Sequence, residues 1–230
     1  MEETTTYAMP RIGDQAPNFK ANTTKGPIEM DSFGKDKWIV MFSHPADFTP
    51  VCTTEMSGFA VRKPEFDELN TELLGLSIDS IHSYLGWVEN VHEKTGVYFD
   101  FPIIADIDMK VSKLYGMLQP NESETAAVRA VFFIDPKGII RTMIYYPLSL
   151  GRNFQELYRV LIGLKTADKN EVALPADWQP GDDVIVPTAG SCGVAEDRIS
   201  NKESDIHCHD WFFCTKKLSE EEVKKAIEER

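Results

Sequence analysis

Cys52 occupies a position whose neighbours favour a thiolate. The apolar run from Trp38 to Phe42 ends in a loop, after which Thr49 and Pro50 are typical of the cap and the first residue of a helix. Cys52 therefore falls in the first helical turn, where unpaired backbone N–H groups and the positive end of the helix dipole stabilise a negative sulfur. Because only the thiolate is a good nucleophile, this placement predicts a reactive cysteine.

Three neighbours distinguish Cys52 from an ordinary buried cysteine. Most free cysteines are small, buried and inert, and a cysteine at a helix start fits that description too. Here Pro50 makes the turn rigid, Thr49 brings a hydroxyl within one turn of the sulfur, and His44 follows the strand with a titratable ring. These neighbours favour the reactive interpretation.

The segment resembles the active-site loop of the peroxiredoxins. Their signature Pro-x-x-x-Thr-x-x-Cys is met by Pro45, Thr49 and Cys52. The fuller form, with His44 before Pro45 and the run from Asp47 to Glu55, is similar to the one-cysteine-like branch with a long C-terminal extension, especially its archaeal members. The resemblance extends over residues 13–214 and so covers nearly the whole chain. It implies that Cys52 reduces peroxides.

Arg129 is the candidate partner of the sulfur. Its guanidinium is permanently charged and carries several donors, although a surface charge at a strand end is the alternative. The resemblance decides, because the family's active-site arginine precedes the strand that matches residues 131–135 here. We expect Thr49 to accept from a peroxide hydroxyl while donating to the sulfur, Pro45 to shield the intermediate from water, and His44 to line the mouth of the pocket.

Glu55 poses an electrostatic problem. A carboxylate one turn after Cys52 disfavours a thiolate. We therefore expect Glu55 to pair with an arginine, and Arg152 is another position that matches the family pattern. Glu55 would then be an orienting group for the site.

The oxidised form of Cys52 would be a sulfenic acid, which needs a second thiol for recycling. The candidates are Cys192, Cys208 and Cys214. The resemblance to archaeal long-tailed members covers Cys208 and Cys214. Cys214 is the expected resolving thiol because it follows the apolar stretch Trp211 to Phe213, which would anchor it near the active site of another subunit. Cys208 lies six residues earlier, close enough to be its exchange partner. Cys192 matches nothing in the family pattern and is expected to be a spectator.

The same tail admits a metal interpretation. Residues 207–214 hold two histidines and two cysteines, which are zinc-capable types. Their spacing is poor for a closed tetrahedral site, with five residues between the cysteines and a histidine on each side of Cys208. We therefore predict neither a metal site nor a cofactor.

Composition limits the partners and the compartment. The 230 residues carry 24 basic and 37 acidic side chains, and the net charge of −13 argues against nucleic acid or an anionic membrane surface as a partner. The N-terminus lacks the parts of a signal peptide, and no apolar run is long enough to cross a bilayer. With only four cysteines, the sequence predicts a cytoplasmic protein rather than a secreted disulfide scaffold.

Residues 10–166 are predicted to form a thioredoxin-like α/β sandwich. A buried strand at 38–43, a helix at 50–69 kinked by Pro64, an apolar run at 73–78 and a helix at 80–94 make a βαβ unit with parallel strands. A short strand at 101–105 and a short helix at 108–115 follow. Antiparallel strands at 129–134 and 139–145 are joined by a turn, and a helix at 152–166 completes the domain.

Residues 167–230 are predicted to form a separate C-terminal arm for dimerisation and resolution. Proline and glycine make the segment loop-rich, and Ser219 with Glu222 forms a capping box for a last helix at 220–230. The family resemblance implies dimers, joined into a ring of five dimers. The apolar stretch Trp211 to Phe213 is expected to be buried against a second subunit.

These observations predict a thiol peroxidase that reduces hydrogen peroxide and small alkyl hydroperoxides, with an external dithiol such as a thioredoxin-like protein as reductant. Two other functions remain open from the residues alone. One is a general disulfide oxidoreductase on the same fold. The other is a non-enzymatic ring or holdase whose cysteines are incidental.

Overall fold

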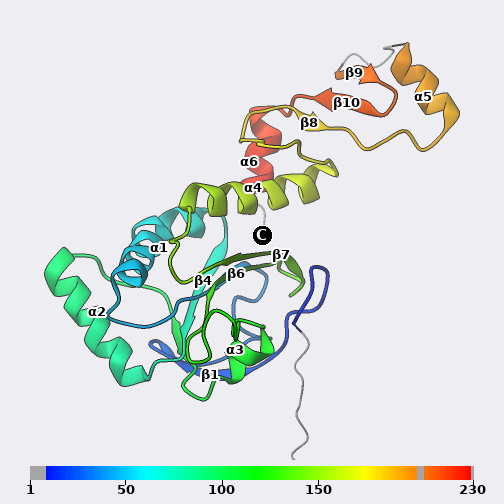
Figure 1. Ribbon diagram of the computed structural model, residues 1–230. Coiled ribbons are helices and arrows are strands. Elements are labelled where there is room, and N and C mark those ends of the chain that lie inside the picture. The colour runs from blue at the N-terminus through cyan, green and yellow to red at the C-terminus, as the bar shows by residue number, and fades with distance from the viewer. Residues whose placement is uncertain (1–8, 201–204, 229–230) are drawn as a thin grey trace, which may run out of the picture. The chain divides into compact units, whose positions relative to one another are not determined.

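The structure is a computed structural model that describes residues 9–200 and 205–228 (Figure 1). The chain divides into two compact units, one extending through Phe154 and the other starting at Gln155. The predicted boundary at 166/167 would leave the helix that begins at Phe154 in the first domain, whereas the units divide at its start. The domain assignment itself remains a prediction.

The first unit is built on a seven-stranded sheet with the order β2-β1-β5-β4-β3-β6-β7. Strands β3, β4 and β5 are parallel, β6 is antiparallel to β3, and β7 is antiparallel to β6, which confirms the predicted parallel and antiparallel pairs. The strand bounds are β1 Lys20–Thr23, β2 Gly26–Glu29, β3 Trp38–Ser43, β4 Thr71–Ser77, β5 Ile103–Ala105, β6 Arg129–Ile134 and β7 Ile140–Tyr146.

Strand β3 is buried along its whole length, because both faces of the sheet are covered. Its side chains alternate between two packed layers. Met41 belongs to the cluster that also holds Tyr115 and Phe132, whereas the ring of Phe42 stacks on that of Phe59 with centroids 3.7 Å apart. The sandwich predicted from the continuous apolar run is confirmed.

Three helices of this unit follow the predicted order: α1 Pro50–Glu68, α2 Ile81–Thr95 and α3 Lys110–Leu114. Helix α1 packs on β4 and α2 on β5. Ser80 caps α2 by accepting from the backbone N–H of Ser83, and Gly96 ends the helix in a left-handed conformation. Helix α1 continues through Pro64 to Glu68, so the expected kink remains a prediction.

The second unit contains more regular structure than its proline and glycine content predicted. A three-stranded antiparallel sheet has the order β8-β10-β9, and the capping box at Ser219 and Glu222 is present. The bounds are α4 Phe154–Asn170, β8 Val184–Ile185, α5 Cys192–Ile199, β9 Ile206–Asp210, β10 Phe213–Lys216 and α6 Glu220–Glu228. Residues 229–230 of the predicted last helix lie outside the described residues. Within the described ranges, no helix has the length and apolar character to span a membrane.

Candidate active site

Cys52 lies in the first turn of α1 and is fully buried. Pro50 is the first helical residue and Thr49 occupies the N-cap position, as the sequence predicts. The Thr49 hydroxyl, however, donates to the carbonyl oxygen of Ala46 at 2.9 Å and does not cap the helix. The expected donation from Thr49 to the sulfur is therefore replaced by a bond within the turn, which leaves the hydroxyl oxygen as an acceptor.

Arg129 contacts the sulfur directly. Its Nη1 lies 3.4 Å from Cys52 Sγ and 2.6 Å from Glu55 Oε2. Its Nε and Nη2 both donate to the carbonyl oxygen of Leu148, at 3.1 and 2.8 Å. A fixed guanidinium at this distance supplies a permanent positive charge and an N–H donor beside the sulfur.

Glu55 is shared by two arginines. Besides Arg129, Arg152 Nη1 donates to Glu55 Oε2 at 2.7 Å and the Arg152 backbone N–H donates to Oε1 at 2.9 Å. All three side chains are at most 3% exposed. One carboxylate between two guanidiniums leaves a net positive charge beside Cys52, which resolves the electrostatic problem that the sequence posed.

Arg152 is held by main-chain oxygens as well as by Glu55. Its Nη2 donates to the carbonyls of Ala130, at 3.0 Å, and of Ser43. Burial lowers the pKa of Arg152 to about 10, against the raising effect of the Glu55 charge. The guanidinium is therefore still charged at neutral pH and can fix the carboxylate.

Sheet pairing explains why these residues meet. In the antiparallel register Phe42 lies opposite Val131, so the start of β6 is next to the end of β3, where the loop to Cys52 begins. The hydroxyl of Ser43 ties the two strands by donating to the Val128 carbonyl at 2.6 Å and accepting from the Ala130 N–H at 3.1 Å. Arg129, the first residue of β6, is thereby directed to the first turn of α1.

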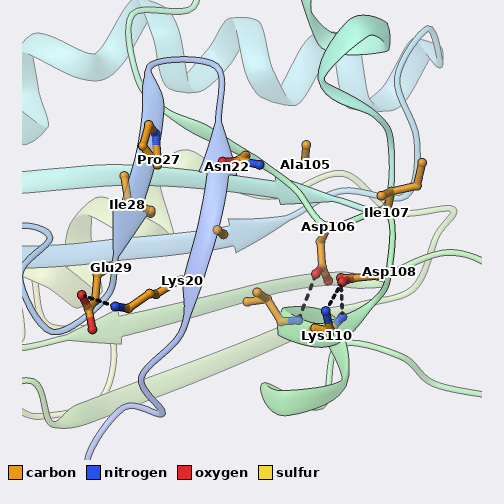
Figure 2. A pocket seen from close by; sticks show the side chains of 12 residues that line it. Lys20, Asn22, Pro27, Ile28, Glu29, Ala105, Asp106, Ile107, Asp108 and Lys110 are labelled. Atoms are coloured by element: carbon orange, nitrogen blue, oxygen red, sulfur yellow. Dashed lines mark hydrogen bonds and ion pairs between the residues drawn. The ribbon is translucent and has the colours of Figure 1, made fainter.

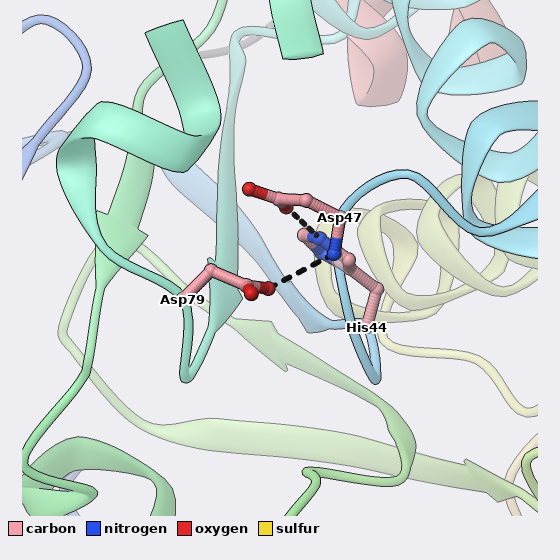
Figure 3. Close-up of side chains that lie close together, drawn as sticks. All are labelled: His44, Asp47 and Asp79. Carbon is pink, nitrogen blue, oxygen red and sulfur yellow. Dashed lines mark hydrogen bonds and ion pairs between the residues drawn. The ribbon is translucent and has the colours of Figure 1, made fainter. Parts of the chain in front are cut away.

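The structure encloses His44, and its expected place at the mouth of a pocket remains a prediction. The side chain is fully buried, and its Nε2 lies 3.0 Å from Asp47 Oδ1 (Figure 3). The ring packs 5.3 Å from the ring of Trp87 and meets Tyr84 edge-on at 6.0 Å. The aromatic residues of α2 therefore bury a histidine that the sequence places in a loop.

Asp47 and Asp79 extend this buried contact into a network that shapes the loop. The backbone N–H of Asp47 donates to Asp79 Oδ2 at 2.9 Å, and the Ser77 hydroxyl donates to the same oxygen at 2.6 Å. Burial raises the pKa of Asp47, against the lowering effect of its bond to His44. These two carboxylates were not predicted as site residues, although Asp47 stands inside the signature and Asp79 lies two residues after the end of β4.

The role of the Leu148 carbonyl as an acceptor for Arg129 was not predicted either, because a pattern of side chains does not reveal which main-chain oxygen will accept. Pro45 is partly buried in the loop between His44 and Ala46. The structure thus brings Cys52, Arg129, Glu55 and Arg152 into contact, and sets Thr49 at the cap of the same helix.

A cavity of about 550 Å³ lies elsewhere, between the β1–β2 hairpin and the loop after β5 (Figure 2). Four of its charged side chains form two pairs, Lys20 with Glu29 at 3.2 Å and Lys110 with Asp108 at 2.5 Å. Cys52 does not line it. The hollow therefore has no part in the chemistry of the buried sulfur.

In the second unit, Cys208 and Cys214 form a disulfide, the pairing that the sequence analysis anticipated as an exchange product. They lie opposite each other in the β9–β10 pair. The rings of His207 and His209 pack edge to face, with centroids 4.7 Å apart. Cys192, the first residue of α5, is free and exposed.

Comparison with known protein families identifies the family of this chain. The AhpC/TSA family matches residues 12–143, and the C-terminal domain of 1-Cys peroxiredoxin matches residues 163–192. The chain belongs to the peroxiredoxin family. It is therefore a thiol peroxidase with a thioredoxin-like fold and a C-terminal extension.

Relatives in archaea and bacteria match almost end to end. A peroxiredoxin of Methanosarcina mazei is 50% identical over 215 residues, covering 91% of this chain and 98% of its own. Peroxiredoxin 2 of Caldanaerobacter subterraneus is 51% identical over 210 residues, covering 91% and 94%. The archaeal affinity predicted from the signature is confirmed.

Solved structures agree with this assignment. The yeast mitochondrial 1-Cys peroxiredoxin superposes with a TM-score of 0.81 at 42% identity, covering 91% of this chain and 100% of its own. A cysteine-to-serine mutant of peroxiredoxin 6 from Arenicola marina gives a TM-score of 0.80 at 32% identity, covering 91% and 99%.

Proposed function

We propose that Cys52 is the thiol that reduces the peroxide. Its thiolate attacks one peroxide oxygen, the O–O bond breaks, and Cys52 becomes a sulfenic acid while the other oxygen leaves as hydroxide or alkoxide and takes up a proton. The contact between Arg129 Nη1 and Cys52 Sγ, at 3.4 Å, is the observation that carries the proposal.

The neighbouring residues have distinct roles in this proposal. Arg129 donates to the peroxide oxygens and stabilises the charge that develops on the leaving oxygen. The Thr49 oxygen accepts from the peroxide hydroxyl, since its own proton is engaged by Ala46. Glu55 and Arg152 are positioning residues that fix Arg129, His44 holds the loop through Asp47, and Pro45 keeps water from the intermediate.

The substrates we assign are hydrogen peroxide and small alkyl hydroperoxides. Cys52 has no exposed surface, and Arg129, which is bonded to Glu55, contacts its sulfur from the start of β6. A buried sulfur of this kind favours a small substrate. Four cysteines in 230 residues are too few for a secreted disulfide scaffold, so we assign this peroxidase to antioxidant defence in the cytoplasm.

Recycling follows from the tail cysteines in this proposal. Cys214 of another subunit attacks the Cys52 sulfenic acid, water leaves, and an intersubunit disulfide forms. Cys208 then attacks Cys214, which releases the Cys52 thiolate and gives the Cys208–Cys214 disulfide, the pairing present in β9–β10. Because the Cys52 sulfur then leaves from the side of Cys214 opposite Cys208, this exchange requires β8 to move away from that side. A thioredoxin-like dithiol reduces it. The yeast mitochondrial relative has a thiol resolving mechanism via glutathione and thioredoxin systems, which supports a reductant of this class.

Substitution of the nucleophile tests the function. Cys52→Ser should abolish dithiol-dependent peroxide consumption with an unchanged circular dichroism spectrum, because a hydroxyl is barely ionised at neutral pH. Cys192→Ser is the matched control and should keep full activity. More than trace activity in Cys52→Ser would overturn the assignment, and full disulfide reductase activity in that variant would favour a general disulfide oxidoreductase.

A further inference from the structure

The two sulfurs of the Cys208–Cys214 disulfide lie in unequal places of the small sheet. Cys214 is on β10, the central strand, with β8 on one side and β9 on the other. It is fully buried. Cys208 is on β9, which has the edge position, and its surface is partly exposed.

Main-chain pairing places β8 beside Cys214. The Val186 N–H donates to the Cys214 carbonyl oxygen at 2.9 Å, and Thr215 pairs with Ile185. The strand β8 and the residue after it therefore flank Cys214 on the side away from Cys208. Helix α5 contacts β9, and Cys208 keeps part of its surface open beside it.

Thiol–disulfide exchange depends on which sulfur the attacking thiolate can reach. The thiolate approaches one sulfur roughly in line with the S–S bond, and the other sulfur leaves. An in-line approach to Cys208 comes from the edge of the sheet. The equivalent approach to Cys214 comes from the side that β8 occupies.

We propose that the external reductant attacks Sγ of Cys208 and that Cys214 is the leaving thiolate. This rests on the proposed recycling. The first reductant thiolate forms a mixed disulfide with Cys208, and the S–S bond to Cys214 breaks. The second thiolate of the reductant then attacks the reductant sulfur that is bonded to Cys208. The Cys208 thiolate leaves and takes up a proton, and the reductant becomes a disulfide. The reductant is thus held on Cys208, and the freed Cys214 is the thiol that the next sulfenic acid requires.

Trapping the mixed disulfide tests this order. The full-length protein is oxidised with diamide, so that the Cys208–Cys214 disulfide forms without peroxide turnover. A thioredoxin variant with serine for its second active-site cysteine supplies a single thiolate, and N-ethylmaleimide stops the reaction. Cleavage before Asp210 separates the two cysteines for mass spectrometry. We expect thioredoxin on Cys208 and maleimide on Cys214, at least about tenfold over the reverse arrangement. Equal amounts, or an excess on Cys214, would overturn the proposal.

Glutathione provides a control for the effect of the fold. The same mapping is carried out on the folded protein and on protein unfolded in guanidinium chloride. The preference for Cys208 should fall to within about twofold on unfolding, because both sulfurs are then accessible. The same preference in the unfolded chain would trace it to the local sequence and contradict the argument from strand position.

A separate experiment tests the recycling scheme independently of the sulfur that the reductant attacks. Peptide mapping after one equivalent of peroxide shows whether turnover itself produces the Cys208–Cys214 disulfide. Its absence there would contradict the recycling scheme. The trapping experiment still shows which sulfur of the diamide-formed disulfide, that of Cys208 or that of Cys214, the reductant attacks.

Discussion

Arg129 satisfies three acceptors at once, and the shape of its side chain makes this possible. Two nitrogens donate to the Leu148 carbonyl, while Nη1 reaches both Glu55 and the sulfur of Cys52. The planar guanidinium holds these donors in fixed directions, whereas an ammonium is a compact charge on a flexible stem. Charge and geometry therefore act together beside Cys52.

Arg129→Lys should keep the charge and lose the geometry. We expect kcat/KM for hydrogen peroxide to fall by about 100-fold or more, the scale seen when one charge-stabilising donor is removed. The measurement is dithiol-dependent peroxide consumption. Arg62→Lys is the matched control, because Arg62 lies over the ring of Phe154 at 5.0 Å and does not contact the sulfur. A rate equal to that of the wild type would make Arg129 purely structural.

Single residues differ in how well the sequence predicted them. Cys52, Thr49 and Arg129 stand in a signature or at a recognisable strand start, and the structure places them together. The burial of His44 was not predicted, because it depends on Tyr84 and Trp87, which a later helix supplies. The sequence around His44 does not indicate these aromatic neighbours, because the two segments meet only in the folded sheet.

At the scale of elements, Glu55 joins three parts of the first unit. From α1 it accepts from Arg129 at the start of β6 and from the Arg152 side chain and backbone in the segment after β7. Removing one member of a buried ion pair leaves the others without compensation, which is more costly than replacing the whole cluster with apolar residues. The carboxylate therefore determines both the position of Arg129 and the stability of the site.

Glu55→Gln keeps the size of the side chain and removes its charge. We expect the free energy of unfolding, measured in urea, to fall by about 3–5 kcal/mol, because two buried guanidiniums then face each other. Peroxidase activity should fall as well. Glu221→Gln removes a carboxylate from the exposed pair with Lys225 and should change stability by less than about 0.5 kcal/mol. Equal effects of the two substitutions would show that the buried carboxylate has no special role.

Elements with strong apolar periodicity were predicted well, and short polar ones were not. The βαβ unit follows from long buried runs. The β1–β2 hairpin has four-residue strands with largely exposed or half-buried side chains, and β9 reads Ile-His-Cys-His-Asp, with no buried residue. Such strands form because distant partners pair with them. This is why a segment rich in proline and glycine was described as loop although it forms a sheet.

At the scale of the whole molecule, three consecutive exposed aromatic residues point to assembly. Trp211, Phe212 and Phe213 are 45%, 54% and 40% exposed. We propose that they are covered by a second subunit in a dimer and that five dimers form a ring. Sedimentation velocity at micromolar concentration should show no monomer, and Phe212→Ser should shift the distribution to smaller species. Val61→Ser, at a 63% exposed position of α1, should not. A monomeric wild type would contradict assembly.

The recycling route gives the assembly a covalent signature. In the proposed scheme the Cys52 sulfenic acid of one subunit reacts with Cys214 of another, so peroxide should produce a disulfide-linked dimer on non-reducing gels. Cys208→Ser should accumulate this band, because the thiol that releases Cys52 is then missing. Cys52→Ser and Cys214→Ser should both abolish the band. Cys214→Ser should also leave Cys52 prone to overoxidation. Cys192→Ser is the control and should change nothing. A dimer band that does not depend on both Cys52 and Cys214, or no band at all, would mean that the enzyme recycles as a one-cysteine peroxidase, with an external thiol reaching Cys52 directly.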